Sequence, residues 1–98
     1  MTEVELSFDW DQWNVQKNEI KHGVSQLEAE SVFYDPDLVL FDDLEHSSQS
    51  ELRYIGYGES KLNRVLMVAF TFRKKKVRII SARPASRKER QVYHESQT

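Results

Sequence analysis

The sequence predicts an α+β fold: two N-terminal helices, an antiparallel sheet of about four or five strands, and a C-terminal helix. Three observations support this prediction. Two helix-capping patterns, Ser25 with Glu28 and Ser86 with Glu89, stand well apart, the second one near the C-terminus. Most of the sequence between them consists of short runs rich in β-branched and aromatic residues. The length of 98 residues is typical of a single domain, so residues 1–98 are expected to fold as one unit.

The N-terminal segment is expected to form a short strand followed by a helix. Residues 4–8 alternate apolar and polar side chains, as a half-buried strand does. Asp9 or Asp11 can then cap a helix, and Gly23 supplies the left-handed residue that ends it at about His22. The apolar side chains expected to pack inward from this region are Trp10, Trp13 and Ile20.

A second helix is predicted over residues 26–33. Ser25 at the N-cap and Glu28 three positions later form a capping box, in which each side chain accepts from the other's backbone N–H. Pro36 stops the helix because proline disfavours helical backbone in the residue before it. The side chains expected on the buried face are Leu27, Ala29, Val32 and Phe33.

The rest of the chain is predicted to be mostly strand. The apolar runs expected as strands cover residues 38–41, 52–57, 64–72 and 77–82. An acidic, serine-rich loop over residues 42–50 and a basic hairpin connection over residues 73–76 separate them. The second capping box then begins a third helix, which runs to about Glu95. With helices on one face of the sheet, the other face is free to meet water or a ligand.

Composition excludes several functional classes. The chain has no cysteine, which excludes a disulfide framework and a thiolate metal site. Its three histidines are scattered, which argues against a zinc site. No apolar run approaches the length of a membrane-spanning helix, and the start of the chain is unlike a signal peptide. We therefore expect a cytoplasmic protein with no cofactor and no membrane partner.

The net charge of −2 hides a strong asymmetry. Residues 1–52 contain 13 acidic and 2 basic side chains, whereas residues 53–98 contain 12 basic and 3 acidic ones. An acidic half joined to a basic half indicates a polyanionic partner. Pairing of the two halves within the fold is the alternative, and charge alone favours neither.

Several motifs together resemble the BrnT family of bacterial toxins, over about residues 8–93. The most specific are the Lys21-His22-Gly23 turn and the Arg78-Ile79-Ile80-Ser81-Ala82-Arg83 block. The distance between the two motifs along the sequence also matches the family. The chain departs from the family's usual residues at Asn14, where lysine is usual, and at Gln26, where an aromatic residue is usual. Other matching residues are Phe8, Asp9, Trp10, Asp11, Asn18, Val24, Ser25, Glu28, Ala29, Val32, Phe33, Asp35, Pro36, Arg53, Gly58, Thr71, Arg73, Ala85, Glu89, Arg90 and Tyr93.

This resemblance implies a RelE-like fold and an endoribonuclease that cleaves mRNA and inhibits translation. It also implies a BrnA-like antitoxin, which binds DNA through a ribbon-helix-helix-type domain. Toxin and antitoxin would form a complex with two copies of each, and operator DNA would be contacted only through the antitoxin. Charge complementarity favours an acidic antitoxin arm on the basic C-terminal half.

RNA can be cut without a metal when its 2′-hydroxyl attacks the adjacent phosphate, a reaction that needs a base, an acid and stabilising cations. His22 is the candidate acid or base, since imidazole ordinarily titrates near neutral pH; otherwise it only interacts with the carbonyls at the helix end. Arg83 is the candidate for phosphate stabilisation, because guanidinium binds phosphate oxygens in pairs; its structural alternative is an ion pair with Glu89. The further candidates for RNA or phosphate binding are Lys21, Arg53, Arg64, Arg73, Arg78 and Arg90.

Strand alternation places Arg78 and Arg83 on opposite faces unless a bulge intervenes. Glu89 is expected to serve mainly in the capping box, and Tyr93 to lie in the core. Two other functions fit the same residues. One is a catalytically weak RelE-like module that acts as corepressor with its antitoxin, and the other is an RNA-binding accessory domain unrelated to toxins.

Overall fold

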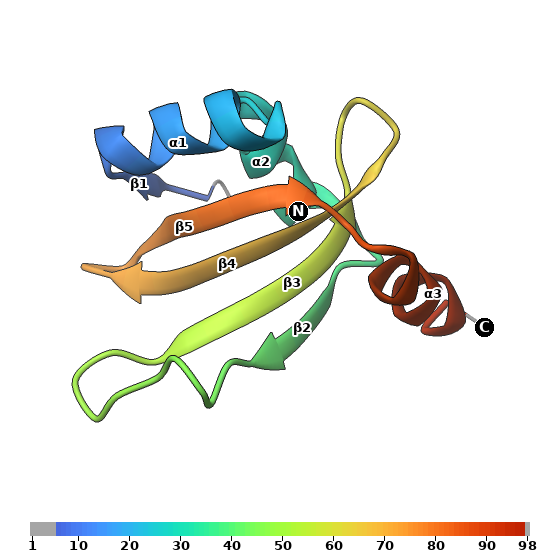
Figure 1. Cartoon of the computed structure of the whole chain (residues 1–98). Coiled ribbons are helices and arrows are strands. Elements are labelled where there is room, and N and C mark those ends of the chain that lie inside the picture. Colours follow the sequence, from blue (N-terminus) through green and yellow to red (C-terminus); the bar gives the residue numbers. More distant parts are fainter. Residues whose placement is uncertain (1–5, 98) are drawn as a thin grey trace, which may run out of the picture.

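The computed structural model describes residues 6–97, without the Ile20 side chain, as an α+β fold (Figure 1). The predicted order of helices and strands is confirmed. The strands are β1 (Phe8–Trp10), β2 (Val39–Asp42), β3 (Arg53–Glu59), β4 (Val65–Arg73) and β5 (Lys76–Pro84). The helices are α1 (Gln12–His22), α2 (Gln26–Ser31), the short 3-10 helix η1 (Val32–Tyr34) and α3 (Arg87–Glu95).

The strands form one mixed sheet in the order β1-β5-β4-β3-β2. The expectation of a purely antiparallel sheet is wrong at one edge, where β1 runs parallel to β5 and Phe8 lies opposite Val77. Parallel pairing requires a crossover connection, and here the chain from α1 to β4 provides it. The first strand was expected over residues 4–8 but covers Phe8–Trp10, and residues 4 and 5 lie outside the described part.

Side-chain and glycine caps fix the helix ends. The carboxylate of Asp11 accepts the Trp13 backbone N–H at 2.8 Å and begins α1, and Gly23 ends it at a φ of 64°. The capping box of α3 is complete, as predicted. The box of α2 is only half formed, because Ser25 accepts from the Glu28 N–H while the Glu28 side chain turns into the interior.

The helices α1 and α2 and the 3-10 helix η1 cover one face of the sheet, which we call the packed face (Figure 1). The prediction that Trp13 and Leu27 lie in the core is wrong, since these residues are 72% and 64% exposed. The apolar stripes of both helices are narrow, so these positions face water. The buried cluster on the packed face consists of Val24, Ala29, Val32, Leu66, Val68, Phe70, Val77, Ile79 and Ala82.

The 3-10 helix η1 lies directly against β3 because Gly58 has no side chain. A Cβ atom at Gly58 would lie 2.7 Å from the Cγ1 atom of Val32 and 2.9 Å from the Cδ1 atom of Leu38. Val32 has no room to withdraw, since it is fully buried. This close approach sets the distance between the helical layer and the sheet.

A buried carboxylate connects the helical layer to the start of β4. Glu28 is 1% exposed and binds Arg64 through two hydrogen bonds, Nε to Oε2 at 2.7 Å and Nη2 to Oε1 at 2.6 Å. Ser60 donates to Oε2 at 2.7 Å, and Arg64 also donates to the Gly23 carbonyl at 2.9 Å. The network therefore joins the end of α1, the helix α2 and the β3–β4 turn.

Removing the Glu28 charge should destabilise the fold. Breaking one partner of a buried ion pair leaves the other unpaired, and we expect Glu28→Gln to cost about 3 kcal/mol, because Arg64 keeps some access to water. Glu19→Gln, on the exposed side of α1, is the matched control and should change little. Urea denaturation of both variants measures the difference, and equal stability would contradict this role.

The same pair gives stability a defined pH dependence. Hydrogen bonds from Arg64 hold the pKa of Glu28 below its ordinary value, although burial opposes them. A carboxyl with a lowered folded-state pKa stabilises the fold above its ordinary pKa and loses this contribution as pH falls through the lowered value. The free energy of unfolding should therefore decrease below about pH 4, and by less in Glu28→Gln than in the wild type. Urea denaturation at a series of pH values measures this, and parallel curves for the two proteins would contradict it.

Candidate functional site

The sheet face opposite the packed face, which we call the open face, carries side chains in cross-strand rows. One row contains Arg53, Thr71 and Arg78, and another contains Tyr57, Met67 and Arg83. The helix α3 covers only one end of this face, where Ala85 and Tyr93 pack with Val65, Val39 and Tyr57. Cationic side chains from neighbouring strands thus lie on a surface beside α3.

A β-bulge places Arg78 and Arg83 on the same face. Ser81 lies opposite Ala69, but Ile79 lies opposite Phe70, so Ile80 is the extra residue. The bulge shifts the alternation of β5 by one position, which returns Ala82 to the packed face. The expectation of opposite faces for the two arginines held only without a bulge, and the structure contains one.

Arg83 is held by a bidentate ion pair with Glu89. Nη1 lies 2.7 Å from Oε1 and Nη2 lies 2.9 Å from Oε2, while Oε1 also accepts the Ser86 N–H at 2.7 Å. Burial acts to raise the pKa of Glu89, but the hydrogen bonds from Arg83 and Ser86 outweigh it and lower this pKa. The carboxylate is therefore ionised at neutral pH and keeps the guanidinium in a fixed position.

Tyr57 lies beside this pair on β3, across Met67 from Arg83. Burial, reinforced by the charge of Glu89, raises the pKa of Tyr57 although Arg83 opposes the shift. Its phenol therefore keeps its proton at neutral pH and can donate one. Sequence reasoning missed this residue, because only the strand register brings it into the Arg83 row.

The C-terminal part of β5 forms a sheet edge next to α1. Among residues 6–97, strand β1 pairs with Val77, Arg78 and Ile79, and no described strand lies beside the following residues of β5 on this side. The Oδ1 atom of buried Asn18 accepts the Ala82 N–H at 3.3 Å and fixes α1 to this edge. We call this region, where α1 meets residues 80–84, the β5 edge.

The β5 edge brings the two most specific motifs together. His22 follows Asn18 by four positions and so lies on the same side of α1, and Arg83 directly follows Ala82. Lys21 is exposed beside His22. The hydrogen bond between Asn18 and Ala82 therefore brings the helix that ends in the Lys21-His22-Gly23 turn to the end of the Arg78–Arg83 block. The Arg83 side chain lies on the open face.

A known protein family combines these motifs. The profile described as "Ribonuclease toxin, BrnT, of type II toxin-antitoxin system" matches residues 10–89. The match covers both motifs and most of the chain. The chain belongs to the BrnT family of ribonuclease toxins. The resemblance predicted from the two motifs is thus confirmed, and membership of a type II system implies a cognate antitoxin.

The crystal structure of the Brucella abortus ribonuclease toxin BrnT is similar to this chain. The two share 23% sequence identity and a TM-score of 0.61, over 85% of this chain and all of that one. At this identity the likeness shows a shared fold. A search of curated proteins finds no match. Within residues 6–97, no helix is long and apolar enough to span a membrane.

The other arginines predicted to bind RNA or phosphate lie in separate parts of this BrnT-family chain. Arg64 is engaged in the Glu28 network, and Arg90 donates to the Ala85 carbonyl at 2.9 Å, so both have structural partners. Arg53 pairs with Glu51 at 2.9 Å on the surface. Arg73 is exposed at the far end of β4. These positions do not converge on one point.

The acidic and basic halves of this BrnT-family chain do pair in places. The Arg78 guanidinium lies 3.5 Å from Asp9 and 3.4 Å from Asp11, and Arg64 binds Glu28. Ion pairs within the fold therefore account for part of the charge asymmetry.

The departure at Gln26 is accommodated within the helical layer. The Gln26 amide donates to Glu30 at 3.2 Å, and the same carboxylate oxygen accepts from the Trp10 indole at 2.6 Å. The polar side chain at position 26 thus binds the carboxylate of Glu30, which in turn joins α2 to the end of β1.

The predicted RNA contacts of Arg53 and Arg78 imply an affinity that depends on salt. Replacing Arg53 or Arg78 by alanine removes one cation that can bind a phosphate, so the slope of log affinity against log salt should decrease by about 0.7 for each arginine replaced. Arg87→Ala, on the exposed surface of α3, is the matched control. Fluorescence anisotropy with labelled single-stranded RNA measures the slope, and identical slopes for all variants would remove these arginines from the interface.

Proposed function

We propose that this chain is the endoribonuclease toxin of its toxin–antitoxin pair and that it cleaves mRNA at the β5 edge, without a metal ion. The observation that carries the proposal is the position of Arg83, which lies in the open-face row of Tyr57 and directly follows Ala82, whose N–H binds Asn18 of α1. An RNA phosphate bound to Arg83 would thus lie beside Tyr57 and at the sheet edge to which Asn18 fixes α1, four residues before His22.

The proposed reaction is an internal transfer within the RNA. His22 takes the proton of the 2′-hydroxyl, whose oxygen attacks the adjacent phosphorus and forms a P–O2′ bond. The P–O5′ bond breaks, and the leaving 5′-oxygen receives a proton from Tyr57, whose raised pKa keeps it protonated. The products are a 2′,3′-cyclic phosphate and a 5′-hydroxyl. Arg83 stabilises the charge that develops on the phosphate oxygens.

In this proposal Glu89 positions Arg83 rather than reacting. Both of its oxygens contact the guanidinium, which is thereby aligned before substrate arrives. Lys21, Arg53 and Arg78 contribute to RNA binding along the open face and its edge, whereas Arg73 lies apart from them at the far end of β4. A BrnA-like antitoxin of the ribbon-helix-helix type neutralises the toxin by covering this surface, in a complex with two copies of each chain. Operator DNA is contacted through the antitoxin alone.

A second function is supported by the ion pairs of the open face. Arg78 and Arg83 both contact carboxylates of the same chain, which weakens their attraction for phosphate. A chain in which these pairs persist would cleave slowly and act mainly as corepressor with its antitoxin. The two functions differ in whether the purified chain cuts RNA.

Replacing Arg83 should abolish most cleavage without unfolding the chain. Loss of one group that stabilises transition-state charge typically lowers the rate about 10²–10³-fold. The cleavage rate of Arg83→Ala should therefore be lower than that of the wild type by this factor. Arg83→Lys should recover only part of the rate, because an ammonium cannot bind two phosphate oxygens in a planar fork. The measurement is cleavage of labelled RNA by purified protein in the presence of EDTA, with mass spectrometry of the product ends.

Arg90→Ala is the control, since Arg90 is another arginine of the same region but only contacts a carbonyl. It should cleave at the wild-type rate. Equal rates for the wild type and Arg83→Ala would contradict the proposed site. A folded wild type that cuts no RNA would favour the corepressor function.

A further inference from the structure

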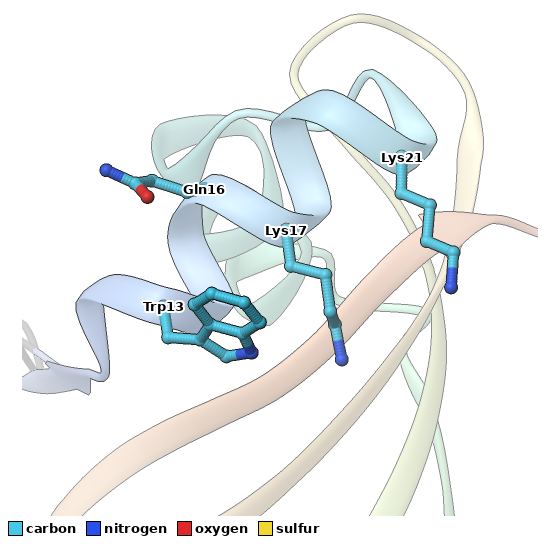
Figure 2. A pocket seen from close by; sticks show the side chains of 4 residues that line it. All are labelled: Trp13, Gln16, Lys17 and Lys21. Atoms are coloured by element: carbon cyan, nitrogen blue, oxygen red, sulfur yellow. The ribbon is translucent and has the colours of Figure 1, made fainter.

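An exposed tryptophan and two lysines share one face of α1. Trp13, Lys17 and Lys21 are spaced by four residues, so they stand one above the next along the helix. Figure 2 shows all three pointing toward the β5 side of the helix, whereas Gln16 points away. Together with Gln16 they line a shallow groove on the surface. We call these three residues the α1 stripe.

Nothing within the described residues accounts for this stripe. Trp13 is 72% exposed, although an indole gains from burial. Lys17 and Lys21 form no ion pair within residues 6–97. The stripe therefore presents an apolar ring and two cationic groups that the fold itself does not use.

The stripe is continuous with the β5 edge. Lys17 and Lys21 stand on either side of Asn18 in the sequence, and the Asn18 side chain binds the Ala82 N–H. Arg83 is the next residue on β5. A polyanion that extends from Arg83 past this edge can therefore meet the lysines, which point toward the β5 side of α1.

We infer that the α1 stripe binds the single-stranded RNA next to the cleaved bond, with an unpaired base stacked on Trp13 and neighbouring phosphates on Lys17 and Lys21. The inference rests on the proposed ribonuclease function and extends its site along α1. Base stacking on an aromatic ring combined with cations along a backbone is how proteins hold single strands without sequence preference. The stripe thus selects unpaired RNA over duplex, whose bases are not free to stack.

RNA suits this surface better than a protein arm does. A protein partner would gain most from apolar contacts around Trp13, but the neighbours along its stripe are lysine side chains with projecting ammonium groups. Each ammonium can meet a phosphate of a continuous backbone, and the ring can meet a base between them. An acidic antitoxin segment is the competing occupant, and the experiment separates the two.

The test uses the full chain and a labelled 2′-O-methyl RNA, which binds but cannot be cleaved through its 2′-oxygen. Trp13→Ala should weaken binding about 10-fold, whereas Trp13→Phe should retain much of the affinity because a phenyl ring still stacks. Lys17→Ala should weaken binding and reduce the salt slope by about 0.7. RNA should quench tryptophan fluorescence in the wild type, and this quenching should be largely absent in Trp13→Phe.

Leu27→Ala is the matched control, since Leu27 is an exposed apolar residue of α2 outside the stripe. It should bind RNA like the wild type. Unchanged affinity of both Trp13→Ala and Lys17→Ala for an RNA that the wild type binds would overturn the inference and leave the proposed cleavage standing. Loss of affinity in these variants, in a chain that cuts no RNA, would support the stripe and contradict the cleavage. If the variants lose only antitoxin binding, the occupant is a protein and the inference is wrong.

Discussion

The Glu28–Arg64 ion pair is the constraint on which the geometry of the molecule depends. It joins three segments of the chain: the end of α1, the helix α2 and the residue that precedes β4. Burying a charge is unfavourable unless it is paired and hydrogen-bonded, and here Ser60 completes the shell of the carboxylate. With α2 and the end of α1 fixed in this way, Asn18 meets Ala82 and the histidine turn lies at the β5 edge.

A second constraint is local to β5. A single extra residue, Ile80, returns Arg83 to the face that carries Arg78 and places it in the row of Tyr57. The sheet thereby serves two purposes with one strand: its packed face fills the core with Val77, Ile79 and Ala82, and its open face carries arginines. Ion pairs to Asp9, Asp11 and Glu89 hold those arginines in place and partly neutralise their charge.

Local signals predicted the elements well, and long-range pairing explains the differences. Gly23 and the Ser86 box predicted the correct helix ends, because caps depend on a few neighbouring residues. The half-formed box at Glu28 was not visible, since its carboxylate binds an arginine far away in the sequence. The Ile80 bulge was not predictable either, because two adjacent isoleucines fit both registers. The arginines can be named as candidates from the sequence alone, whereas the position of Tyr57 and the exposure of Trp13 require the fold.

The central claim is that catalysis occurs where α1 meets the end of β5. Growth of a bacterial host during induced expression of the wild type, Arg83→Ala, His22→Ala and Arg73→Ala tests it most directly, with soluble folded protein verified for each. We predict growth arrest by the wild type and by Arg73→Ala, whose side chain lies at the far end of β4. We predict normal growth with Arg83→Ala and His22→Ala. Arrest by both of these variants would contradict the claim.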